Sequence, residues 1–146
     1  MNPLVRRFLR SAIFFLAIGL GIGIWMIYAR EFGGSLPPRI MSAHTHSLLV
    51  GFEMLMITGV ALWMFPRPRP DDNMYKPFLA ELSWWGIAGG TLVRVALELT
   101  LRGSVPTIWR ALLVGAGVAQ ALGMLLFFAN MWTRIRSSGA KSPGRT

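Results

Sequence analysis

Two histidines, His44 and His46, are the only ones in a chain of 146 residues, and a single residue separates them inside an apolar segment. Neutral imidazole is the commonest metal ligand among protein side chains, so the pair is a candidate metal site. At about 100° per residue, positions i and i+2 of a helix project roughly 200° apart. Both imidazoles therefore cannot easily hold one metal ion from a single helix, and each ring is expected to face its own interhelical space.

The residues two helical turns further along differ between the two faces. Glu53 follows His46 by seven residues and is expected on its face, whereas Gly51 follows His44 by seven residues. Since a helix brings i and i+7 to nearly the same side, a flat, bulky ligand could lie against His44 over Gly51. The alternative is that both histidines are wetted, or hydrogen-bonded to the backbone and to Glu53.

Further ionisable residues lie inside apolar segments, where they are costly and by default mark a function. Arg94 and Glu98 are four residues apart. This spacing predicts either a simple intrahelical ion pair or a site in which Arg94 binds an anionic group. For Glu53 and Glu81 we expect structural hydrogen bonds, with a proton relay as the alternative.

Four apolar segments position these side chains, and each is long enough to cross a bilayer core of about 30 Å as a helix. They comprise residues 11–28, 40–65, 78–101 and 107–132. Glycine and proline clusters separate them, and the six tryptophans lie near their ends. We therefore predict an all-α integral membrane four-helix bundle over residues 1–136, with a disordered basic tail over residues 137–146. The first segment is interpreted as a retained helix rather than a signal peptide, because its apolar stretch is long.

The basic residues predict the orientation of this bundle. Ten Lys and Arg side chains lie at the two ends of the chain and between the second and third segments, against three or four in the other connections. By the positive-inside rule both termini are cytoplasmic. Six polar residues then share the outer half of the bilayer. They are Arg39, His44, His46, Arg94, Glu98 and Arg110.

Composition excludes several classes of protein. Apolar residues make up 53% and charged residues 14% of the chain. Soluble domains carry roughly 25% charged residues, so a water-soluble monomer is excluded. The net charge of +9 lies at the edges of apolar segments rather than on one polar face, so no nucleic-acid partner is expected. A copper or zinc carrier using His44, His46 and Glu53 is disfavoured by the divergence of the two rings and the absence of cysteine.

Small residues recur every four positions in three of the segments. They are Gly19 and Gly23, then Gly86 and Gly90, then Ala111, Gly115, Ala119 and Gly123. Helices in lipid associate through such close backbone approaches. The stripes predict packing within the chain or contacts between copies.

The stretch from Arg39 through His44-Thr-His46 to Gly59 and Pro66 resembles the second helix of the catalytic subunit of haem-copper oxidases. The similarity is to the branch of cbb3-type oxidases and nitric oxide reductases. In that family the first histidine of the segment ligates a low-spin haem near the outer face, which implies that role for His44. The family's subunit has twelve helices and its copper ligands lie on later ones. The resemblance thus implies no oxygen- or NO-reducing copper centre in one copy, and terminal oxidase activity of a lone chain is not expected.

The same resemblance implies an assembly. The family's twelve helices form three arcs of four, and one arc carries a His-x-His pair that serves two haems in adjacent pores. This chain is then one arc, and a homotrimer rebuilds the ring. Each space between protomers would hold a non-covalent haem b between His44 of one protomer and His46 of the next. Arg39, Arg94 or Arg110 would neutralise its propionates, and the absence of cysteine excludes a covalent c-type haem.

The function implied by this resemblance is a haem-b protein of a bacterial or archaeal inner membrane. It transfers electrons or binds NO or O2 beside a respiratory or denitrification complex. Whether the chain is itself an enzyme stays open. The alternative is a non-catalytic accessory or assembly subunit of a larger oxidase or NO reductase, in which the histidines are vestigial.

Overall fold

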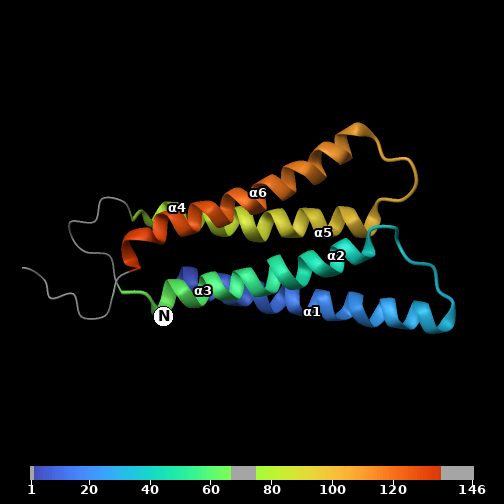
Figure 1. The fold of residues 1–146 in the computed structure, drawn as a ribbon, viewed down its shortest axis with the longest axis horizontal. Helices are drawn as coiled ribbons and strands as arrows, with labels where there is room; N and C mark the ends of the chain where they lie inside the picture. Colours follow the sequence, from blue (N-terminus) through green and yellow to red (C-terminus); the bar gives the residue numbers. More distant parts are fainter. Residues whose placement is uncertain (1, 67–74, 136–146) are drawn as a thin grey trace, which may run out of the picture.

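The computed structural model describes residues 2–66 and 75–135, and within these ranges it contains helices and no strand. The first and fourth helices are α1 (Pro3–Phe32) and α6 (Thr107–Met131), the latter ending in the 3-10 turn η3 (Trp132–Arg134). The second helix consists of α2 (Ile40–Thr45), η1 (His46–Met54) and α3 (Leu55–Met64). The third consists of α4 (Pro77–Trp84), η2 (Trp85–Gly89) and α5 (Gly90–Thr100). The predicted all-α helical bundle is confirmed (Figure 1).

Three of the helices are long and apolar enough to cross a membrane. They are Pro3–Phe32, Ile40–Met64 and Thr107–Arg134. The third helix, residues 77–100, is about 36 Å long at 1.5 Å per residue, which also matches a bilayer core. It carries three charged residues and lies beside the apolar helices (Figure 1). The chain is thus a membrane protein, and the passage of its third helix through the bilayer stays a prediction.

The helix ends differ from the predicted segments for local reasons. Helix α1 begins at Pro3 rather than at residue 11. At this start the Asn2 side chain accepts a hydrogen bond from the Leu4 N–H at 2.9 Å. It ends at Gly33, whose φ of 76° is the left-handed conformation that favours glycine. The basic side chains before residue 11 simply extend the helix past the apolar stretch. The predicted disordered tail, 137–146, lies outside the described residues.

The bundle is closed at the end where α1 begins. Buried side chains from all four helices form one core there: Val5, Phe8, Ala12, Phe15, Leu55, Leu62, Ile87, Ala88, Phe127 and Met131. The rings of Phe8 and Phe127 meet edge to face with centroids 5.9 Å apart. At the rim, Arg7 Nη1 donates to Glu81 Oε1 at 2.6 Å, so Glu81 makes the predicted structural contact.

The opposite end of the bundle is open. Its smaller core joins Ile22 of α1 to Ile40 and Ala43 of α2 and Val95 of α5. Helix α6 adds nothing to this core, because its buried residues begin only at Ala116. Accordingly α6 diverges from α5 towards its first residue (Figure 1). The candidate residues His44, Arg39 and Arg94 line grooves at this open end.

Close approach at the closed end depends on small residues. A Cβ atom on Gly86 would lie 2.9 Å from the Ala119 carbonyl oxygen and 3.0 Å from Gly123 Cα. A Cβ atom on Gly90 would lie 2.8 Å from the Ala116 carbonyl oxygen. These glycines therefore serve helix packing within the chain, which was one of the two roles predicted for them, the other being contacts between copies. Gly115, by contrast, would place its Cβ atom in open space.

Replacing Gly86 by alanine should destabilise the protein by about 1–3 kcal/mol, since the added methyl group must push two backbones apart. Gly115→Ala is the matched control, and it should stabilise the helix by about 0.5–1 kcal/mol through the better helix propensity of alanine. Thermal unfolding in detergent, followed by circular dichroism, measures both. Equal melting temperatures for the two variants would contradict the close approach of α6 at Gly86.

Candidate functional site

His44 lies near the end of α2 and turns its ring toward α1. Its Nδ1 atom is 2.9 Å from the Gly19 carbonyl oxygen. One turn further along α1, a Cβ atom on Gly23 would lie 3.0 Å from His44 Cε1. The glycines of α1 therefore let the imidazole approach the backbone of that helix, and the ring packs against them.

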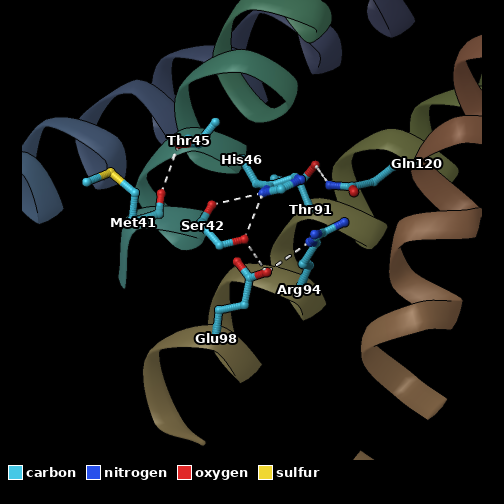
Figure 2. Close-up of polar contacts among 8 residues, drawn as sticks. All are labelled: Met41, Ser42, Thr45, His46, Thr91, Arg94, Glu98 and Gln120. Carbon is cyan, nitrogen blue, oxygen red and sulfur yellow. Dashed lines mark hydrogen bonds and ion pairs between the residues drawn. The ribbon is translucent and has the colours of Figure 1, made fainter. Parts of the chain in front are cut away.

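His46 opens η1 and faces away from α1. Its Nδ1 atom lies 2.9 Å from the Ser42 carbonyl oxygen and 3.3 Å from the Ser42 hydroxyl oxygen. The ring stands beside Arg94 and Glu98 of α5 (Figure 2). The two imidazoles thus contact different elements on different sides of the second helix, as the i, i+2 spacing predicts.

Both imidazoles are held in the same protonation form. A carbonyl oxygen accepts a hydrogen bond and has no proton to donate. The bonds to Gly19 and Ser42 therefore require a proton on Nδ1 of His44 and of His46. In the neutral ring this leaves the lone pair on Nε2, which is the form that ligates a metal.

A groove of about 660 Å³ lies beside His44 between α1 and the start of the second helix. We call it the α1–α2 groove. Its lining is mostly apolar: Leu20, Gly23, Ile24, Met26, Ile27, Arg30, Leu36, Met41 and His44. The groove combines one imidazole, one cationic residue and apolar walls, which suits a large apolar ligand with an anionic edge.

A second groove, of about 590 Å³, lies on the other side of the second helix. We call it the α5–α6 groove. It is lined by Arg39, Ser42, Arg94, Glu98, Leu113, Val114, Gly117, Val118 and Ala121. Its polar residues come from α2 and α5 and its apolar wall from α6. His46 does not line this groove, but it contacts the groove residue Ser42.

Polar side chains beside the α5–α6 groove form a continuous network (Figure 2). Arg94 Nε donates to Glu98 Oε1 at 3.0 Å, and the Ser42 hydroxyl donates to the same oxygen at 2.7 Å. The Glu98 side chain is only 4% exposed. Within the described part of the chain, its Oε2 atom is buried and has no hydrogen-bond partner. The predicted Arg94–Glu98 ion pair is confirmed, and it faces a groove.

Just below this network, the buried Gln120 side chain joins α6 to α5. Gln120 Nε2 donates to Thr91 Oγ1 at 2.9 Å, and Thr91 Oγ1 donates to the Ile87 carbonyl oxygen. Both side chains are buried. From Gln120 towards the first residue of α6 the two helices diverge, so this bond marks where the closed part of the bundle ends and the open end begins.

The face that was expected to stay open beside Gly51 is filled. A Cβ atom on Gly51 would lie 2.5 Å from Phe15 Cγ, so the phenyl ring of α1 packs directly on this glycine. Gly51 thus serves the close packing of α1 on η1. A ligand beside His44 has its space in the α1–α2 groove instead, over Gly23.

Glu53 forms with the described residues neither the structural hydrogen bond expected of it nor the bond to His46 that the alternative interpretation of the histidines included. Residues 46–54 are a π-helix, in which i→i+5 hydrogen bonds widen the turn and reduce the rotation per residue. Seven residues therefore no longer complete two turns. Glu53 is exposed, and it makes no hydrogen bond or ion pair with any residue that the structure describes.

The predicted arginines divide between the two sides of this region. Arg39 and Arg94 line the α5–α6 groove together, whereas Arg110 is exposed on α6 and lines neither groove. Ser42, which connects His46 to Glu98, was not predicted from the sequence, and neither was Arg30, which lines the same groove as His44. The spacing of Ser42 four residues before His46 is the one signal that could have identified it.

Comparison with known protein families gives a match over nearly the whole chain. The family model described as Cytochrome C and Quinol oxidase polypeptide I matches residues 3–145. No curated protein and no solved structure matches. Among residues 2–66 and 75–135, no group of three or more His, Cys, Asp or Glu side chains is placed to hold a metal ion.

Replacing Arg94 by methionine should destabilise the protein by about 3 kcal/mol, because it leaves the buried Glu98 carboxylate without its cation. The double variant Arg94→Met, Glu98→Leu should recover most of this loss, since no unpaired charge remains. Arg110→Met is the control, with an expected change within about 0.5 kcal/mol for an exposed residue. Thermal unfolding in detergent compares the three variants, and a double variant less stable than Arg94→Met would contradict the pairing.

Proposed function

The chain belongs to the family of cytochrome c and quinol oxidase polypeptide I, and on this premise we propose that it binds haem b non-covalently through His44 and His46. The match confirms the resemblance read from the sequence, and it covers nearly the whole chain. When bound, haem b would supply a one-electron redox centre, and His44 and His46 would hold its iron. The residues present at the open end suit this group on three counts.

The observation that carries the proposal is the state of the two imidazoles. Each has its Nδ1 within hydrogen-bond distance of a backbone carbonyl, an arrangement that in the neutral ring leaves the lone pair on Nε2. Backbone hydrogen bonds of this kind are the usual support of a metal-ligating histidine, because they fix the ring and raise its basicity. Such bonds also satisfy purely structural histidines, and the grooves beside the two rings are what favours ligation here.

The surroundings of the imidazoles provide the second and third counts. The α1–α2 groove gives His44 an apolar chamber, with Arg30 among its lining residues. The α5–α6 groove lies next to His46 and carries Arg39 and Arg94. Arginine binds carboxylates in two-pronged pairs, so these side chains suit haem propionates. Arg39 and Arg94 are better placed for this than Arg110, which lines neither groove.

We propose further that the haem is shared between protomers. His44 and His46 serve different sides of the second helix, so each side offers one imidazole from a given copy. A ring of copies with closed symmetry brings the His44 side of one protomer against the His46 side of the next. Three copies give twelve helices, and we favour this homotrimer. Ligation by two imidazoles would favour electron transfer, whereas ligation by one imidazole would favour binding of NO or O2.

The proposed orientation puts both termini on the cytoplasmic side of a bacterial or archaeal inner membrane. Arg6, Arg7 and Arg10 extend the N-terminal end of α1 at the closed end of the bundle. The positive-inside rule then places the open end, with both grooves, at the outer face. A site there suits exchange of electrons within a respiratory or denitrification complex.

Mixing two variants tests the shared site. His44→Ala and His46→Ala protein, each purified alone, should lack six-coordinate haem. Co-expressed at equal levels with two different tags, they should recover about one third of the wild-type six-coordinate haem in oligomers that carry both tags, because one of the three interfaces of a mixed trimer then keeps both histidines. Absorption spectra of the reduced and oxidised protein measure this content.

Other outcomes of this experiment are equally informative. Loss of haem in only one of the two single variants would exclude shared ligation by two histidines. A wild-type preparation that stays free of porphyrin, even when haem is supplied, would overturn haem binding. If that preparation also co-purified with a large oxidase or NO reductase, it would favour the non-catalytic accessory subunit.

A leucine at position 23 should block the chamber beside His44. Its Cβ atom would start 3.0 Å from His44 Cε1, so the rest of the side chain must displace the imidazole. Gly23→Leu should therefore lower haem content on the order of tenfold. Gly21→Leu is the matched control on the same helix, since its Cβ atom would meet nothing within 4 Å. Comparable haem content in the two variants would contradict the assignment of this groove.

A further inference from the structure

The hydroxyl group of Ser42 stands between a carboxylate and an imidazole. It donates to Glu98 Oε1 at 2.7 Å, and its oxygen lies 3.3 Å from His46 Nδ1 (Figure 2). A serine hydroxyl has one proton to donate and two lone pairs that accept. Because the proton is committed to Glu98, the oxygen can only accept from His46.

This arrangement leads to a specific role for the buried carboxylate. We propose that Glu98 is a positioning residue that acts through Ser42 to fix the Nδ1-protonated form of His46. The Nε2 atom of His46 is thereby kept free for a metal. The part of the inference that concerns iron rests on the proposed haem binding, whereas the protonation form of the ring can be measured without haem.

Glu98 is suited to this role by its own surroundings. Its side chain is 4% exposed, and Arg94 Nε donates to the same Oε1 atom at 3.0 Å. The other charged residue lining the α5–α6 groove, Arg39, is also a cation. A carboxylate flanked in this way accepts hydrogen bonds and does not donate them, so it leaves the Ser42 hydroxyl a single orientation.

Without Glu98 the hydroxyl regains its freedom. It can then rotate and donate to Nδ1, which stabilises the alternative form of His46 with the proton on Nε2. In that form the ring presents an N–H group, not a lone pair, to a metal. The Ser42 carbonyl, 2.9 Å from Nδ1, still favours the ligating form, so the two forms would coexist.

His44 provides an internal control. Its Nδ1 atom contacts the Gly19 carbonyl oxygen, and none of its hydrogen bonds to described residues involves a hydroxyl group. Loss of Glu98 should therefore leave the form of His44 unchanged. The chain has only these two histidines, so the ring signals of both are observable in one spectrum.

The first experiment records ¹⁵N NMR shifts of the ring nitrogens in haem-free protein labelled at histidine. We expect both rings in the Nδ1-protonated form in the wild type. Glu98→Ala should convert a measurable share of His46 to the Nε2-protonated form, while His44 stays as it was. The double variant Ser42→Ala, Glu98→Ala should restore the wild-type form, because no hydroxyl is left to donate.

The second experiment titrates the same variants with haem. Glu98→Ala should weaken haem binding about tenfold, the lower end of the effect of removing a partner of a metal-ligating histidine. In the Ser42→Ala background, adding Glu98→Ala should change haem affinity little, because no hydroxyl is left to donate. A merely structural role of Glu98 would give the same loss in both backgrounds.

Several results would overturn the inference. They are a His46 ring with its proton on Nε2 in the wild type, an unchanged ring in Glu98→Ala, or additive losses of haem affinity. If Glu98→Ala does not fold, Glu98→Gln is used, whose amide keeps the volume and can donate to Ser42. Failure of the wild type to bind haem would refute the proposed function while leaving the NMR result to decide the role of Glu98.

Discussion

A hydrogen bond from an imidazole to a backbone carbonyl is the interaction on which the open end of this bundle depends. It occurs twice, from His44 to Gly19 and from His46 to Ser42. The first partner lies on a neighbouring helix and the second lies one turn earlier on the same helix. Because each bond uses Nδ1, both rings expose Nε2, and the spacing of the two residues sends them to opposite sides. The proposed sharing of a haem between copies follows from this geometry.

This geometry requires charged side chains to be buried at the open end, which is energetically unfavourable. Polar groups inside a bilayer must find partners within the protein, and an unpaired charge there is expensive. Arg94 and Glu98 meet that requirement as a pair, and Ser42 extends it toward His46. The closed end supplies the compensating stability through Phe8, Phe127 and the residues around them. The apolar core of the closed end thus stabilises the bundle, whereas the open end depends on its polar contacts as well as on packing.

Much of this arrangement could be predicted from the sequence, because it depends on regular helical spacing. The divergence of His44 and His46 follows from i and i+2, and the Arg94–Glu98 pair follows from i and i+4. The small residues at positions 86 and 90 predict close helix packing, and the structure places it within the chain.

What escaped prediction depends on departures from that spacing and on contacts between helices. The π-helix at residues 46–54 changes the rotation per residue, so Glu53 leaves the face of His46. Phe15 packs on Gly51 from another helix, and a contact between helices cannot be predicted from the local sequence pattern. Ser42 has no significance by itself and acquires one only because α5 brings Glu98 to it.

The contrast between the two ends also has a consequence for motion. Local stability in a protein follows the number of buried contacts, so backbone amides at the Phe8–Phe127 end should resist exchange with deuterated water the longest. The start of α6 has no buried residue before Ala116, and α5 holds it through Gln120 and through the close approach of Gly90 to Ala116. Outward motion of this start would leave the core undisturbed. A large planar group could enter sideways from the lipid after the chain has inserted, with no need to unfold any helix.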